Sequence, residues 1–192
     1  DFNAWDGRCH AMHRMPMSGI FELFIPDVKA GDIYKYELKL KGNRIELKSD
    51  PYAACTEVPP ANASVVTDTS TFQWEDEIWM KERKKFSDRK QPISIYETSL
   101  TEWKDATELA DFVKKLNYTH VELHPVMEYL DDEAGEYSTF AYYAPTRRFG
   151  TPEDFQKVVN ELHKAGIGLI LDWTPSHFPR VEGGLELFDG TP

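Results

Sequence analysis

The stretch Ile167-Gly168-Leu169-Ile170-Leu171-Asp172-Trp173 decides the fold class of this chain. The almost uninterrupted apolar run from Ile167 to Leu171 is typical of a parallel strand with both faces covered. The carboxylate of Asp172 follows that run directly. Because functional groups collect at the carboxyl ends of parallel strands, Asp172 is a candidate site residue.

Two further strands and two helices precede this run. Residues 93–97 and 119–123 are predicted strands, and residues 106–116 carry an apolar stripe at helical spacing. The next helix begins at Thr151-Pro152-Glu153, with a capping hydroxyl, a proline at the first position and early acids. Its predicted buried residues are Phe155, Val158, Val159 and Leu162. The pattern predicts a right-handed βαβαβ unit, which fits either a doubly wound sheet or the start of a barrel.

The connection between residues 124 and 150 is long enough to predict a functional loop. The expected strand ends are Glu97-Thr98, His124-Pro125 and Asp172-Trp173, and function is predicted there in either fold. Three carboxylates near these ends are interpreted as structural, with Glu122 expected in a buried pair: Glu97, Glu122 and Glu128.

Residues 1–70 are predicted to be all-β. Residues 20–25 form an apolar run, and residues 33–40 alternate before a two-residue turn at Gly42-Asn43, after which residues 44–48 return. Short strands at this spacing indicate a sandwich. Residues 71–92 are charged and partly helix-compatible, and are predicted to connect two domains.

Composition narrows the classes of function. The chain has 192 residues and a net charge of -11, which argues against a nucleic-acid partner. Cys9 and Cys55 have neither metal-ligand nor disulfide-framework spacing, so we expect reduced thiols, no metal site and a cytoplasmic location. No apolar run suits a membrane span. The ends at Asp1 and Pro192 are expected to be cut from a longer protein.

Seven strings occur in one order along almost the whole chain, and together they resemble the 1,4-alpha-glucan (glycogen) branching enzymes of the alpha-amylase superfamily. They are Asp1-Phe2-Asn3-Ala4-Trp5-Asp6, Tyr34-Lys35-Tyr36-Glu37, Asp50-Pro51-Tyr52-Ala53, Ile95-Tyr96-Glu97, residues 119–128, residues 142–155, and residues 171–179. The last string has the Pro-x-His-Phe-Pro form typical of branching enzymes, whereas most of the superfamily places an Asn before the His.

The resemblance implies a fold and an activity. It implies an immunoglobulin-like β-sandwich of the carbohydrate-binding-module type over residues 1–70, a connecting segment over 71–92, and the first βαβαβ portion of a (β/α)8 TIM barrel over 93–192. Branching enzymes cleave an α-1,4 bond and transfer the segment to a 6-hydroxyl with retention. Retention needs two carboxylates about 5–5.5 Å apart. The resemblance places both beyond Pro192, so this chain alone is expected to be inactive, with no cofactor.

The resemblance also implies which residues contact sugar. Asp172 and His177 match side chains that hydrogen-bond the sugar beside the cleaved bond, and Tyr137 matches the tyrosine that stacks under it. Trp5 and Lys35 match accessory glucan-binding positions of the sandwich. The chain departs from the family pattern at Glu136, Ala141 and Ser176, where the family has glycine, and near Arg44-Ile45, where a second tryptophan is replaced.

Less specific interpretations stay open for each candidate. Trp5 and Tyr137 could pack as ordinary aromatics, and Lys35 could be a solvated strand lysine. Asp172 could be an ordinary charge that caps a strand end, and His177 could be a hydrogen-bonded histidine without function. The alternative functions are a non-catalytic glucan-binding protein, a divergent inactive paralogue, or a structural segment without a ligand. The expected partner is an α-glucan such as glycogen, with no nucleic acid and no membrane, and with self-association through the open edge of the barrel sheet.

Overall fold

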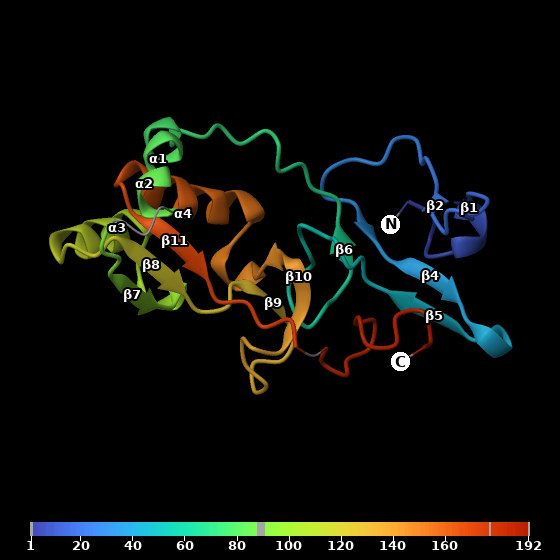
Figure 1. Ribbon diagram of the computed structural model, residues 1–192. Helices are drawn as coiled ribbons and strands as arrows, with labels where there is room; N and C mark the ends of the chain where they lie inside the picture. The colour runs from blue at the N-terminus through green and yellow to red at the C-terminus, as the bar shows by residue number, and fades with distance from the viewer. Residues whose placement is uncertain (1, 88–90, 177, 192) are drawn as a thin grey trace.

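The computed structural model describes residues 2–87, 91–176 and 178–191 (Figure 1). In chain order, its helices and strands are η1 Gly7–His10, β1 His13–Arg14, β2 Phe21–Glu22, β3 Ile33–Tyr34, β4 Tyr36–Lys39, η2 Lys41–Asn43, β5 Ile45–Lys48, β6 Ser64–Val65, α1 Glu77–Glu82, α2 Lys84–Ser87, β7 Ile95–Thr98, η3 Leu100–Glu102, α3 Ala106–Lys115, β8 His120–Leu123, β9 Met127–Tyr129, β10 Thr139–Pro145, η4 Arg147–Phe149, α4 Pro152–Lys164 and β11 Gly168–Leu171.

The second half is built on a three-stranded parallel sheet in the order β11-β8-β7. Each new strand is added beside the previous one, and α3 and α4 both cover one face of the sheet (Figure 1). The sheet does not close into a barrel within the described residues. The predicted βαβαβ unit is therefore confirmed, with strand bounds that differ from the prediction by one or two residues.

Local sequence explains where the two helices begin. Before α3, the Asp105 carboxylate accepts a hydrogen bond from the Glu108 backbone N–H at 2.9 Å. Before α4, Thr151 and Asp154 form a reciprocal capping box, and Pro152 occupies the first helical position. Such caps satisfy N–H groups that have no partner inside the helix. The caps at Asp105 and Thr151 fix the residues at which α3 and α4 begin, and they therefore fix where the preceding loops end.

The hydrophobic core lies between the sheet and these two helices. Leu109, Val113, Val121, Leu123 and Leu162 are all 0% exposed. Burying a side chain of this size stabilises the fold by about 1.5–3 kcal/mol. The strand β11 is unevenly covered within the described residues. Leu169 packs against the core under α3 and α4, whereas Ile170 is half-buried and Leu171 is exposed.

The first half consists of short antiparallel strand pairs, β1–β2, β4–β5 and β3–β6. Gly42 and Asn43 have the positive φ angles expected for the turn between β4 and β5, 79° and 61°, but the turn spans the three residues of η2 and not two. The strand predicted over residues 20–25 shrinks to β2, since β1 offers it only two residues to pair with. Lys48 of β5 is 6% exposed, and its ammonium group donates to the Glu186 carbonyl oxygen at 3.1 Å.

The fold class predicted from the sequence, a β-sandwich-type region followed by the opening of an α/β barrel, is confirmed. Between these regions lie α1 and α2, which replace the single helix-compatible stretch of the prediction. Trp79 of α1 stacks on the His163 ring of α4, with ring centroids 5.2 Å apart. The His163 Nδ1 atom also lies 2.7 Å from Asp76 Oδ2. These contacts fix the connecting segment to the end of α4.

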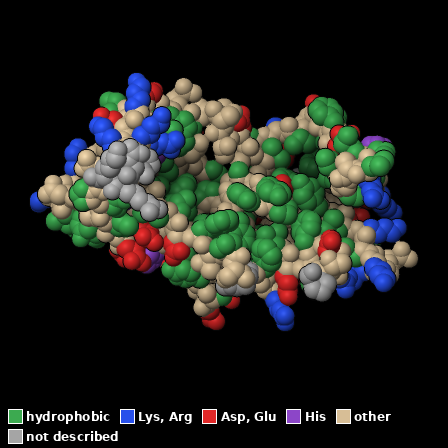
Figure 2. Space-filling model, viewed as in Figure 1, with side chains coloured by type: hydrophobic (Ala, Val, Ile, Leu, Met, Phe, Trp, Pro, Cys, Tyr) green, Lys and Arg blue, Asp and Glu red, His purple; other side chains and the backbone are tan. Residues whose placement is uncertain are grey.

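The connection between β8 and α4 is not a single open loop. It contains the antiparallel pair β9–β10, whose register shifts twice, and the short helix η4. Hydrophobic side chains gather in the middle of the molecule, between the parallel sheet and the N-terminal strands (Figure 2). No helix among the described residues is long and apolar enough to cross a bilayer.

Candidate functional site

The backbone places two polar side chains at the carboxyl end of the parallel sheet. The backbone N–H of His124 donates to the Thr98 carbonyl oxygen, and that of Asp172 donates to the Leu123 carbonyl oxygen, each at 3.0 Å. These bonds extend the strand pairing by one residue beyond β8 and β11. His124 and Asp172 therefore follow strand ends that lie side by side, where barrel and doubly wound folds place their sites.

Tyr137 reaches this edge from the connection between β9 and β10. Its hydroxyl donates a hydrogen bond to Asp172 Oδ2 at 3.0 Å. The same bond, with smaller contributions from desolvation and from nearby carboxylates, raises the pKa of Tyr137 above its ordinary value. Tyr137 is 46% exposed, so its ring is open to solvent. The structure thus brings together two of the three side chains predicted to contact sugar.

The third predicted sugar contact, His177, lies outside the described residues. Nearby aromatics position the chain that follows Asp172. The Tyr142 ring meets the Trp173 and Phe178 rings edge to face, with centroids 6.1 and 5.8 Å apart. The Tyr142 hydroxyl also donates to the Thr174 carbonyl oxygen at 3.4 Å. Tyr142 of β10 therefore contacts Trp173, Thr174 and Phe178 in the chain that follows Asp172.

Sequence reasoning missed the charged group around His124. The His124 Nε2 atom lies 3.4 Å from Glu97 Oε1, and its Nδ1 atom lies 3.2 Å from Glu136 Oε1. Figure 2 shows acidic side chains beside a histidine at this end of the sheet. The signal was available, because His124 follows β8 as Asp172 follows β11, and Glu136 directly precedes Tyr137.

The other predicted carboxylates lie in different surroundings. Glu122 is half-buried beside Glu97 in the register of β7 and β8. The predicted buried pair for Glu122 is not formed among residues 2–87, 91–176 and 178–191, where no ion pair to it occurs. Glu128 is 0% exposed and lies in a dense hydrogen-bond network.

No group of three or more His, Cys, Asp or Glu side chains in the described part of the chain could hold a metal ion.

The accessory positions of the first half differ from each other. Trp5 is 42% exposed and has a φ of 60°, with its backbone N–H donating to Asn3 Oδ1 at 3.1 Å. Lys35 donates to Asn62 Oδ1. Asn62 in turn donates to the Glu182 carbonyl oxygen at 2.7 Å. Lys35 therefore takes part in joining the first half to the C-terminal segment, while Trp5 presents an open ring.

The fold and this strand-end edge define a class, an α/β protein with a polar and aromatic site at the carboxyl ends of its parallel strands and a β-rich module before it. Residues 70–182 match the alpha amylase, catalytic domain family, and residues 1–53 match carbohydrate-binding module 48 (isoamylase N-terminal domain). The chain belongs to the alpha-amylase catalytic-domain family.

Curated relatives include two proteins named 1,4-alpha-glucan branching enzyme GlgB. That of Nitrosococcus oceani is 44% identical over 100% of this chain, and that of Gloeobacter violaceus is 46% identical over 100%. The chain spans 27% and 28% of their respective lengths.

Two solved structures share the fold at low identity. A Salmonella typhimurium protein described as an alpha amylase has a TM-score of 0.70 and 22% identity, covering 93% of this chain and 29% of its own. The pneumococcal glycogen-degrading virulence factor SpuA has a TM-score of 0.62 and 19% identity, covering 88% of this chain and 23% of its own.

Proposed function

We propose that these residues belong to a 1,4-alpha-glucan branching enzyme, and that Tyr137, Asp172 and His177 contact the sugar beside the cleaved bond. The hydrogen bond between Tyr137 and Asp172 carries this proposal, because it joins a planar aromatic ring and an anionic acceptor at one strand-end edge. The curated relatives named as branching enzymes support it.

The geometry suits a pyranose. The exposed Tyr137 ring offers a flat apolar surface for the C–H face of a sugar. Within the described residues, Asp172 Oδ1 accepts no hydrogen bond, so it is available to a sugar hydroxyl, and bonds to a charged acceptor are the stronger ones. In a retaining transfer, a nucleophilic carboxylate displaces the leaving chain, and a 6-hydroxyl then displaces that carboxylate. The site proposed here would hold the sugar during both steps.

A second candidate is a divergent protein that binds glucan without transferring it. It is favoured by the contact between Glu136 and His124, because the branching-enzyme pattern has glycine at the position of Glu136. This contact places a carboxylate and an imidazole next to the stacking ring. We also propose that Trp5 and Lys35 bind glucan in the β-rich first half. The exposed ring of Trp5 suits sugar stacking, whereas Lys35 is hydrogen-bonded to Asn62.

The two candidates are separated by assaying the longest natural chain that carries these residues. Branching activity lowers the iodine absorbance of amylose, whereas binding alone sediments the protein with glycogen. Asp68 is exposed and lies in another segment, so Asp68→Asn is the control. The enzyme hypothesis is supported if branching activity is lost in Asp172→Asn and retained in Asp68→Asn. Sedimentation without any fall in absorbance supports the binding protein.

We also propose the domain division 1–70, 71–92 and 93–192, a cytoplasmic location, and self-association through the outer strands β7 and β11. Each of these two strands has the central strand β8 as its one neighbour among the described residues. An unpaired strand edge is a template for pairing with another chain.

A further inference from the structure

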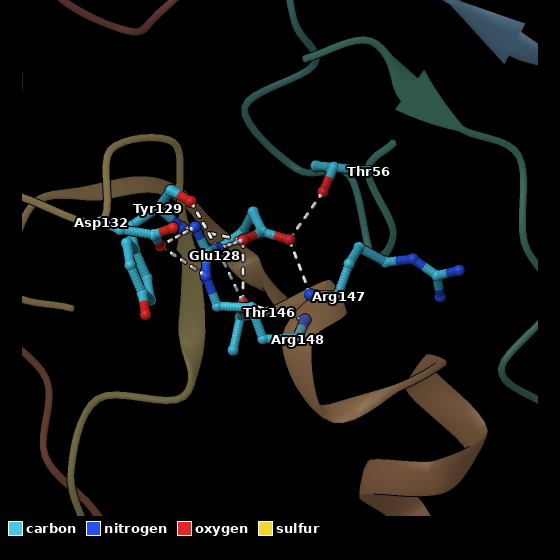
Figure 3. Close-up of polar contacts among 7 residues, drawn as sticks. All are labelled: Thr56, Glu128, Tyr129, Asp132, Thr146, Arg147 and Arg148. Atoms are coloured by element: carbon cyan, nitrogen blue, oxygen red, sulfur yellow. Dashed lines mark hydrogen bonds and ion pairs between the residues drawn. The ribbon is translucent and has the colours of Figure 1, made fainter. Parts of the chain in front are cut away.

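Glu128 is the most completely enclosed charge in the described part of the chain, with 0% of its surface exposed. Its Oε1 accepts hydrogen bonds from Thr146 Oγ1 at 2.9 Å and from the Tyr129 backbone N–H at 3.1 Å. Its Oε2 accepts from the Arg147 backbone N–H at 2.7 Å and from Thr56 Oγ1 at 3.3 Å. Figure 3 shows these groups converging on the one carboxylate.

Arg148 forms an ion pair with this carboxylate and connects it to the residues that follow β9. One guanidinium nitrogen, Nη1, lies 2.9 Å from Glu128 Oε1 and 2.8 Å from the Tyr129 carbonyl oxygen. The Nε atom donates to Asp132 Oδ1 at 2.9 Å, and the guanidinium carbon lies 3.8 Å from the centroid of the Tyr129 ring (Figure 3). Arg148 therefore binds the segment that leaves β9 at two points.

That segment carries Tyr137. It leaves β9 after Tyr129 and returns at Thr139, the first residue of β10. Glu128 lies on β9, and its partners Thr146 and Arg148 follow β10, so the network joins the two strands that support the Tyr137 segment. Thr56 adds a link to the region between the two family matches.

We propose that Glu128 is a positioning residue that fixes the Tyr137 segment against Asp172. This inference rests on the proposed sugar site. A buried ion pair often adds no more stability than an apolar pair of similar size would. A carboxylate with five directed donors does, however, hold its partners in one geometry. The network is therefore suited to orienting Tyr137.

The test is a double-mutant cycle in the longest natural chain that carries these residues. Glu128→Gln keeps the size of the side chain but removes its charge. If Glu128 acts through Tyr137, we expect this change to lower kcat/KM at least about tenfold in the wild type and less than about twofold in a Tyr137→Ala background. Glu153→Gln, a change of an exposed glutamate on α4, is the matched control.

An equal loss of kcat/KM in both backgrounds would overturn the proposal, because the effect would then not pass through Tyr137. Asp132→Asn provides a milder second variant, since Asp132 is exposed and its loss leaves the buried carboxylate intact. We expect it to lower kcat/KM about two- to fivefold and to lose that effect in the Tyr137→Ala background.

Amide hydrogen exchange separates this inference from the proposed function. We expect faster exchange over residues 130–138 in Glu128→Gln than in Glu153→Gln. If the wild-type chain has no branching activity and Glu128→Gln still exchanges faster over residues 130–138, the positioning role is retained and the proposed function is rejected. Unchanged exchange in both Glu128→Gln and Asp132→Asn would reject the positioning role, whatever the activity.

Discussion

The hydroxyl of Tyr137 lies 3.0 Å from Oδ2 of Asp172, although 35 positions separate the two residues in the chain. Asp172 is fixed by the backbone pairing that continues β11 beside β8, whereas Tyr137 depends on the β9–β10 pair and the network around Glu128. Asp172 and Tyr137 are thus held by different parts of the fold. Substitutions around one of these residues should leave the position of the other unchanged.

The hydroxyl and the ring of Tyr137 should make unequal contributions to glucan recognition. Tyr137→Phe keeps the ring and loses one exposed hydrogen bond, so we expect kcat/KM to fall by less than about tenfold. Tyr137→Ala also loses the stacking surface, and we expect a fall of about a hundredfold. Tyr52→Ala, which removes a ring that is 75% exposed, controls for the loss of a surface aromatic. Equal effects of the Phe and Ala changes would reject a stacking role.

Asp172→Asn should be more harmful than Tyr137→Phe, because it removes the anionic acceptor from the sugar as well as from Tyr137. We expect kcat/KM to fall by about a hundredfold or more, with the free energy of unfolding changed by less than about 0.5 kcal/mol. Kinetics and urea denaturation of the same preparation measure both. A large loss of stability with normal kinetics would show that Asp172 is a structural carboxylate.

The cap of α4 allows a test of stability alone. Thr151→Ala removes the hydroxyl from the capping box with Asp154, and we expect a loss of about 1 kcal/mol in the free energy of unfolding. Thr151→Ser keeps the hydroxyl and should remain within about 0.5 kcal/mol of the wild type. If the two variants unfold at the same urea concentration, the capping box contributes nothing measurable.

Stability should also depend on pH through His120. Burial lowers the pKa of His120 below its ordinary value of 6.5, so the folded chain disfavours the protonated ring. The unfolded chain then binds more protons as the pH falls, and stability present above pH 6.5 is lost below it. Urea denaturation at pH 7.5 and pH 5 should show a smaller decrease for His120→Gln than for the wild type. An identical decrease in the two would contradict this, and the exposed residue His13 provides the control change His13→Gln.

The parts of the fold and site that the sequence predicts are those fixed by local patterns. The apolar run ending at Asp172, the cap at Thr151 and the positive-φ pair Gly42-Asn43 each specify their own conformation, and all three occur as expected. The His124 cluster was missed because its two carboxylates, Glu97 and Glu136, are far apart in the chain. Glu97 lies on β7 and Glu136 in the connection between β9 and β10, so only the folded chain brings them together.

Two other errors have a similar origin. Glu122 was expected in a buried pair because alternation turns it away from Val121 and Leu123, whereas among the described residues it is half-buried beside Glu97 without an ion pair. The connection containing Glu128 was predicted to be a functional loop, and the strand pair β9–β10 within it was not predicted. Register shifts in β9–β10 leave no periodic signal that a single sequence could reveal.

A structure of the longest natural chain with a bound maltooligosaccharide tests the central claim most directly. We expect a glucose ring stacked on Tyr137, with one of its hydroxyl groups donating to Asp172. A sugar bound at another edge of the sheet, with Tyr137 turned away from Asp172, would contradict the proposed site.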